Sequence, residues 1–324
     1  MSNISALGKN LTNATDVSEC GKFYNPIESR GELTSVVTAS QLLSSTVNLI
    51  ICPLTVLLNV LVIAAVRKRS RLQSNNNILL ACLAGTDLLT GLVVEPLLLA
   101  MNVASLLGAE HNSCVLYGYL IKAFRFVSFS SLMHLTLVTF ERFIAIKYTM
   151  HYVRIITEKT IKIAVASIWT LTILWELLRF ANTHPKVPIF SSAVFIFLVV
   201  CCIFFIIISY VLIFRETSRH RKQIVSQQLS QEEKQRFLKE NKAFKTTAYV
   251  VGAVILCYVP LILVLSVVYP RKVLLHLLPI ARPWILTSTA LNSLLNPLIY
   301  CWRQEEMKRL VLRNPCSAVA VGPG

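Results

Sequence analysis

Five polar side chains lie inside long apolar stretches of the sequence, four of them about 12–16 Å by helical rise from the polar end of their stretch and Asn296 one turn lower than Asn292. They are Asn59, Asp87, Ser131, Asn292 and Asn296. A lone carboxylate such as Asp87 in apolar surroundings needs a cation, a partner or a proton. A hydrated monovalent cation, Na⁺, is the ligand that we expect in this layer. The alternative is a set of unrelated polar residues that each bond to their own helix, as a serine can.

A second charged set lies where one apolar stretch ends. Glu141 and Arg142 close the stretch that precedes Lys147, and Glu240 follows a basic segment. A pair between Arg142 and Glu240 would neutralise two charges and hold two helix ends together, as switches require. Glu240 could instead complement its own helix N-terminus. Pro260 and Pro297 cannot donate backbone hydrogen bonds, so they loosen two of the apolar helices.

These residues must be positioned by membrane-spanning helices. The chain has 324 residues, of which 55% are hydrophobic and 15% charged, and its apolar residues fall into blocks of about the length of a bilayer span. The blocks are 42–66, 78–101, 116–146, 161–181, 188–214, 243–268 and 281–302. The sequence therefore predicts an all-α membrane protein, a seven-transmembrane helix bundle. We expect an extracellular segment at 1–41, the bundle at 42–302 and a cytoplasmic end at 303–324.

The basic residues predict the orientation of the bundle. Most of the 32 lysines and arginines lie in the loops 67–77, 147–162 and 215–245 or after Tyr300. This excess marks the cytoplasmic side, so the amino terminus is expected outside a plasma membrane and the carboxyl terminus inside. A nucleic-acid partner is not expected, because these charges lie in short loops between spans. The sequons at Asn3, Asn10 and Asn13 are glycosylation sites in the segment expected outside.

The nine cysteines suggest one disulfide at most. Cys20 and Cys114 are the two expected outside, where disulfides persist. They could be paired, or both could be free thiols. No set of cysteines and histidines has metal-ligand spacing, so no metal is expected beyond the sodium layer, and no other cofactor.

Seven spans in this orientation resemble the rhodopsin-like (class A) G protein-coupled receptors. The motifs that carry the resemblance occur in the family's order between residues 40 and 316. They are Asn59 in LLNVLV, Asp87 in LAGTD, Glu141-Arg142-Phe143, Trp169, Tyr210, Cys257-Tyr258-Val259-Pro260 and Asn296-Pro297-Leu298-Ile299-Tyr300. The segment WRQEEMKRLVL that follows is similar to the family's amphipathic eighth helix, with Cys316 as the expected palmitoylation site.

The resemblance implies a role for each motif. The polar layer around Asp87 matches the family's sodium site. Arg142 would engage a heterotrimeric G protein, with Tyr210 and Tyr300 supporting its active side-chain conformation. Tyr258 would be the toggle, although the family usually has tryptophan there. A short second extracellular loop without cysteine, near 182–187, and other departures point to the melanocortin, cannabinoid, lysophospholipid and adenosine cluster, with melanocortin receptors nearest.

The ligand pocket is expected among the outer halves of the helices. Its expected residues are Glu95, Phe124, Arg125, Ser128, Glu176 and Arg282. Phe124 replaces the aspartate of amine receptors, and block 281–302 lacks the lysine that binds retinal, so neither a biogenic amine nor retinal is expected. The arginines could bind an anionic ligand group. They could instead pair internally, as Arg179 can with Glu176 three residues before it.

Other classes of membrane protein fit less well. A transporter or channel usually has paired repeats, broken helices or rings of charge, and the sequence has none. A membrane enzyme needs a nucleophile with its base or a set of metal ligands, and His134, the mid-span histidine, has no such partner at ligand spacing. We expect a receptor surrounded by lipid rather than an enzyme. A non-signalling relative or a transporter is the alternative.

Overall fold

The computed structural model describes residues 31–68, 74–148, 151–181, 187–226, 248–249, 251–264 and 277–303. Nearly all of them are helical. The elements in chain order are α3 (Gly31–Lys68), α4 (Asn75–Leu89), η2 (Thr90–Val94), α5 (Glu95–Leu106), α6 (Glu110–Lys147), α7 (Tyr152–Ile155), α8 (Glu158–Ala181), α9 (Val187–Ser226) and α12 (Leu278–Arg303). The segment Val251–Leu263 is also an apolar helix. This all-α architecture confirms the predicted fold class. The expected eighth helix lies outside the described residues.

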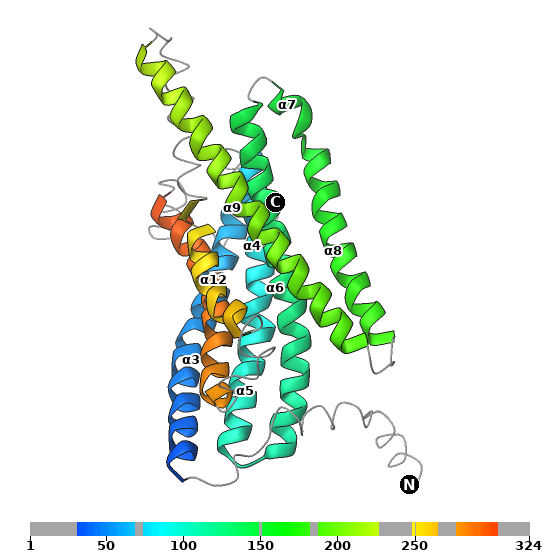
Figure 1. Cartoon of the computed structure of the whole chain (residues 1–324), viewed down its shortest axis with the longest axis vertical. Helices are drawn as coiled ribbons and strands as arrows, with labels where there is room; N and C mark the ends of the chain where they lie inside the picture. Colours follow the sequence, from blue (N-terminus) through cyan, green and yellow to red (C-terminus); the bar gives the residue numbers. More distant parts are fainter. Residues whose placement is uncertain are drawn as a thin grey trace.

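Where the structure describes them, the seven apolar blocks each correspond to a helix or a continuous helical run. Within the described residues, five runs are long and apolar enough to cross a membrane. Segment 251–263 is shorter, and α12 contains Pro283 and Pro297 among several polar residues. The helices extend past the blocks, as α9 does to Ser226, because only the bilayer-facing part of a spanning helix has to be apolar. Figure 1 shows α3, α6 and α8 along the length of the molecule, with α9 crossing them obliquely.

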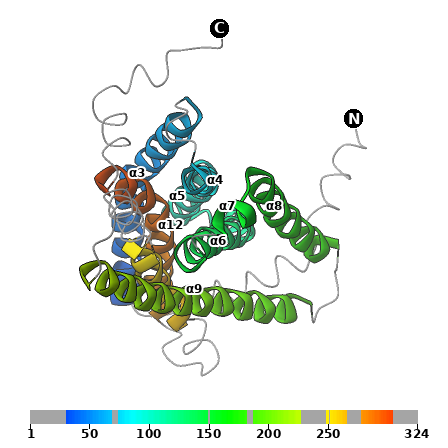
Figure 2. The same cartoon turned by 90° about the horizontal axis from the view of Figure 1, so that it is seen from above.

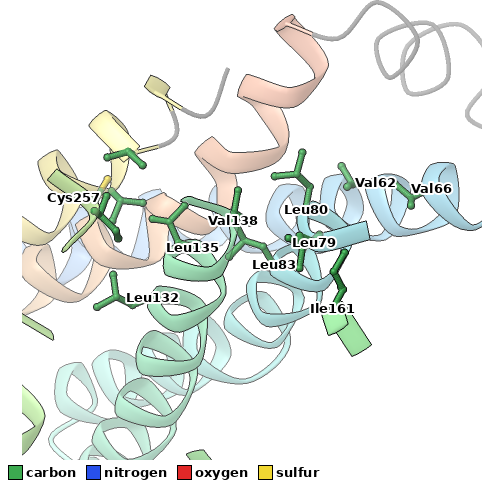
Figure 3. Close-up of a cluster of buried hydrophobic side chains, with 14 of the residues drawn as sticks. Val62, Val66, Leu79, Leu80, Leu83, Leu132, Leu135, Val138, Ile161 and Cys257 are labelled. Atoms are coloured by element: carbon green, nitrogen blue, oxygen red, sulfur yellow. The ribbon is translucent and has the colours of Figure 1, made fainter. Parts of the chain in front are cut away.

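The helix α6 is the centre of the bundle (Figure 2). It packs against α4, α5, α8 and α9, while α12 packs mainly against α3. The largest core cluster joins α3, α4, α6, α8, α9 and segment 251–263. Figure 3 shows Leu79 and Leu83 of α4 beside Leu135 and Val138 of α6 in this cluster. In lipid such packing, rather than exclusion from water, holds helices together.

The second spanning run changes its helical register at η2. Pro96 has no N–H to donate, and the Glu95 N–H bonds to the Thr90 carbonyl in the wider π-helical turn. Gly91 lies at this turn, and a Cβ there would be 2.9 Å from Cγ2 of Val56 on α3. Glycine is therefore required for the close approach of η2 to α3. The wider turn also changes which face of α5 the residues after it occupy.

Candidate functional site

Asp87 is the centre of a buried polar cluster between α4, α6 and α12. Its side chain is fully buried. Ser293 Oγ donates to Oδ1 at 2.9 Å, Ser131 Oγ donates to Oδ1 at 3.4 Å and Asn296 Nδ2 donates to Oδ2 at 2.7 Å. Two helices, α6 and α12, thus supply three hydrogen bonds to one carboxylate on α4. The structure brings together Asp87, Ser131 and Asn296, as the sequence predicted.

Two other members of the predicted layer take different positions. Asn292 does not bond to Asp87, but it is buried nearby and its Oδ1 has no hydrogen-bond partner among the described residues. Asn59 donates to the backbone carbonyls of Thr55 and Ser293, at 2.9 and 3.0 Å. It therefore fixes α12 beside the carboxylate without touching it. Ser293, which donates at 2.9 Å, was not predicted, although it lies directly after Asn292.

A small cavity lies on the outer side of the Asp87 cluster. About 10 Å³ of it admits the centre of a water molecule, which is about what one water needs. Its lining residues are Thr90, Val94, Phe124, Ser128, Ser131, Tyr258, Thr289, Ala290, Asn292 and Ser293. Ser128 lies within hydrogen-bonding reach of the Tyr258 hydroxyl. The lining contains polar but no charged side chains, so this cavity suits an uncharged polar group.

The charged residues predicted for the ligand pocket do not line this cavity. Glu95 is fully buried against α3, where Thr55 bonds to its Oε1. Glu176 forms an ion pair with Arg179 at 3.4 Å. This is the internal pair that we expected from the sequence as the alternative to an anionic ligand. The Arg282 guanidinium lies 4.8 Å from the centre of the Tyr117 ring, which joins the outer ends of α12 and α6. Phe124 and Ser128, by contrast, are lining residues.

At the inner end of α6, Arg142 forms a closed ion pair with its neighbour Glu141. Arg142 Nε bonds to Glu141 Oε2 and Nη2 bonds to Oε1, both at 2.5 Å. Tyr152 of α7 donates its hydroxyl to the same Oε1 at 2.5 Å. The pKa of Tyr152 is raised to about 12, mainly by burial and to a smaller extent by the negative charge of Glu141. The hydroxyl therefore keeps its proton at neutral pH. We call Glu141, Arg142 and Tyr152 the inner latch.

The remaining switch residues surround the inner latch or lie beyond the described chain. Tyr210 of α9 packs with Phe143 against Ile146 and Ile213, next to the latch. Pro260 lies within segment 251–263, and Pro297 lies inside α12. Glu240 and the side chain of Tyr300 lie outside the described residues, so the expected Arg142–Glu240 pair stays a prediction. The same holds for the glycosylation sites Asn3, Asn10 and Asn13 and for the palmitoylation site Cys316.

One of the two cysteines that were expected outside the membrane is oxidised. Cys114, in the first turns of α6, is disulfide-bonded. Among the other described cysteines, Cys52, Cys82, Cys201, Cys202 and Cys257 are free thiols. The partner of Cys114 therefore lies outside the described side chains, as Cys20 does, and their pairing stays a prediction.

A helical bundle with a buried polar cluster at mid-span and a bidentate Glu-Arg pair at one end defines the class of seven-helix membrane receptors. The family model described as "7 transmembrane receptor (rhodopsin family)" matches residues 58–300. The chain belongs to this family. It is a multi-pass membrane protein and a receptor rather than an enzyme.

Within this family, the chain is similar to named adenosine receptors. The chain is 28% identical over 297 residues to the adenosine receptor A2a of Cavia porcellus, covering 82% of this chain and 70% of that protein. It is 27% identical over 296 residues to the adenosine receptor A2a of Homo sapiens, with the same coverage. These relatives confirm the predicted receptor cluster, which included adenosine receptors. The expectation that melanocortin receptors are nearest stays a prediction.

Proposed function

We propose that this receptor transmits the binding of an extracellular ligand to a heterotrimeric G protein and promotes nucleotide exchange on its α subunit. The amino terminus would lie outside the plasma membrane and the carboxyl terminus inside. The observation that carries the proposal is the inner latch, in which a buried arginine is held by two charge-assisted hydrogen bonds at one end of the central helix. A transporter or a purely structural bundle has no need of such a group.

The inner latch explains how the signal could be gated. Releasing Arg142 breaks hydrogen bonds to a charged group, each of which contributes roughly 1.5–3 kcal/mol. A ligand that binds the released state more tightly shifts the population toward it. In that state the sixth helix, which contains Pro260, would move outward and Arg142 would dock on the α subunit. Tyr210, which packs beside the latch on α9, would then support the extended arginine.

We also propose that the Asp87 cluster binds Na⁺ in the resting state. Hard cations prefer oxygen ligands, and the cluster offers the Asp87 carboxylate, the hydroxyls of Ser131 and Ser293 and the oxygen of Asn292. The Oδ1 atoms of Asn292 and Asn296 are buried without hydrogen-bond partners among the described residues, which fits a cation ligand. A bound cation would offset the buried negative charge and favour the resting arrangement. Ligand binding would collapse the site.

The lining of the cavity suggests the kind of ligand. The ligand part that reaches Phe124, Ser128 and Tyr258 would be uncharged and would carry hydrogen-bonding groups, because the lining side chains are neutral. This favours internal pairing of the outer arginines over the anionic ligand. Adenosine is the first compound to test, since the relatives are named adenosine receptors. Neutral nucleosides and peptides follow.

The decisive experiment needs no ligand. The chain is expressed in cells, and G protein activation is recorded across a panel of α subunits for the wild type and for Arg142→Ala at matched surface level. Arg154→Ala is the control, because Arg154 is an exposed cation on the same side. Basal activity that disappears only in Arg142→Ala supports the proposal. Basal activity that survives in Arg142→Ala would overturn it. A chain silent in all three is tested with adenosine as the probe.

A further inference from the structure

Glu95 is a buried carboxyl group that the receptor mechanism does not use, unlike Asp87 and Glu141. It opens α5 directly after η2, and its exposed fraction is 0%. Its Oε1 lies 3.1 Å from Thr55 Oγ1 on α3, and its Oε2 has no hydrogen-bond partner among the described residues. The ion pairs formed within the described chain do not include it. The side chain thus lacks the partners that a buried negative charge needs.

The hydrogens available around Glu95 are too few for a carboxylate. A threonine hydroxyl has one hydrogen, but Thr55 Oγ1 lies 3.0 Å from the Ile51 carbonyl as well as 3.1 Å from Glu95. Two acceptors therefore compete for one hydrogen. If Glu95 carries a proton, it donates to Thr55 Oγ1 and Thr55 donates to Ile51. Both contacts are then satisfied.

The thiol of Cys52 also supplies no spare hydrogen for a Glu95 carboxylate if it donates to a backbone carbonyl. Cys52 on α3 has one S–H hydrogen. Its Sγ lies 3.3 Å from the Gly91 carbonyl oxygen, and it also contacts the Glu95 carboxyl. Its hydrogen is accounted for if it donates to Gly91. The two groups of α3 that face Glu95 are then both directed to backbone carbonyls, and no lysine, arginine or histidine of the described chain is paired with it.

Glu95 also differs from Asp87, the carboxylate that fits a cation. Asp87 receives hydrogen bonds from three side chains on two helices, α6 and α12. Glu95 has one hydroxyl contact, and its surroundings do not offer the roughly six oxygen ligands that a hard cation takes. Glu95 lies eight residues after Asp87, about 12 Å further along the helix. The two sites are therefore separate.

We propose that Glu95 is a proton-binding site of this receptor, occupied in the resting state, in which the carboxylic acid hydrogen joins α5 to α3 through Thr55. The ligand of the site is a proton. The site lies beside the tight contact of Gly91 with Val56 and Thr55, so the two helices must separate before the acid can be solvated and ionise. The proposal does not depend on which ligand or G protein the receptor uses.

Infrared spectroscopy of the purified full-length receptor tests the protonation state directly. The carboxyl C=O band of the wild type is compared with that of Glu95→Gln at neutral pH, in H₂O and D₂O, with Asp87→Asn as the matched control. We expect Glu95→Gln to lose one protonated-carboxyl band that Asp87→Asn retains. If Glu95→Gln instead loses only carboxylate bands, Glu95 is ionised and the proposal is overturned.

Two further variants keep the test open if Glu95→Gln folds poorly. Thr55→Val removes the acceptor of the acid hydrogen, so the same band should shift to higher frequency without disappearing. An unshifted band would overturn the assignment of Thr55 as the partner. In thermal unfolding, Glu95→Gln should keep the wild-type Tm while Glu95→Ala lowers it. Equal losses in both variants, together with a sodium-dependent Tm in the Asp87→Asn background, would indicate a second cation site instead.

Discussion

Arg142 and Tyr152 donate to the same atom, Oε1 of Glu141, each at 2.5 Å. A residue of the connecting segment between α6 and α8 therefore helps to hold the arginine of the central helix. Because the two donors share one acceptor, the loss of either weakens the orientation of Glu141 for the other. The inner latch is thus a three-residue unit across two elements.

Tyr152→Phe tests this unit. It removes one hydrogen bond to a charged group, so we expect the resting state to lose about 1.5–3 kcal/mol and ligand-free nucleotide exchange to rise by about tenfold or more. The measurement is GTP-analogue binding to membranes that contain matched amounts of receptor. Tyr148→Phe is the control, since Tyr148 is exposed and its ring contacts with Phe143 and Lys147 are retained. Unchanged exchange in Tyr152→Phe would show that the hydroxyl does not restrain Arg142.

Ser293→Ala tests the sodium site. The substitution removes the Ser293 hydroxyl, and with it one oxygen ligand and the 2.9 Å hydrogen bond to Asp87. The sodium concentration needed to stabilise the receptor should therefore rise about fivefold, which corresponds to about 1 kcal/mol. Asp87→Asn should abolish the sodium effect on Tm. Ser288→Ala should leave it intact, because that hydroxyl bonds to the carbonyls of Cys257 and Ile285. A sodium effect that persists in Asp87→Asn places the cation elsewhere.

Gly91→Ala tests the tight packing of η2 on α3. The added Cβ would lie 2.9 Å from Val56 Cγ2 and 3.2 Å from Thr55 Cγ2, so we expect a loss of about 1–3 kcal/mol through overpacking. Gly85→Ala is a close control, because its Cβ meets nothing within 4 Å. That variant should be neutral or slightly stabilising, since alanine is the better helix former. Equal thermal stability of the two variants would contradict the requirement for glycine at the π-helical turn.

Cys20→Ser and Cys114→Ser test the partner of Cys114 in its disulfide. Cys114 is disulfide-bonded, and if Cys20 is its partner, each single variant should lose the same stability, about 2–4 kcal/mol, and the double variant no more than either. Thermal unfolding of the purified receptor without reductant measures all three. A Cys20→Ser variant with wild-type Tm would assign the bond to another cysteine.

The sequence predicted the depth of the polar residues better than their direction. Helical rise placed Asp87, Ser131 and Asn296 in one layer, and both Ser131 and Asn296 bond to Asp87. Rise alone does not say which face a residue occupies, so Ser293 was missed and Asn292 was expected on the carboxylate. Ser293 could have been found from its position three residues before Asn296, which places both side chains on the same face of the helix.

Glu95 shows why the ligand pocket was harder to predict. A regular helix would make its face predictable from Asp87, but η2 adds a residue to the turn and changes the face that α5 presents. Pro96 was the visible signal of this irregularity. For Arg142 the structure shows a local pair with Glu141 in its own helix, and the long-range pair with Glu240 stays a prediction because Glu240 lies outside the described residues.

The hydrogen bonds from polar side chains of α3 to α12 have a consequence for the chain while it is being synthesised. Asn48 donates to Thr287, 239 residues later, and Asn59 donates to Ser293, 234 residues later. Each amide also donates to a carbonyl of α3 itself, so α3 depends on α12 for the second hydrogen bond of each amide. Until α12 has been synthesised, that second N–H must be satisfied by the insertion machinery, a chaperone or water. Premature termination before α12 would leave an early product with exposed amides inside the bilayer, a form that cellular quality control can recognise.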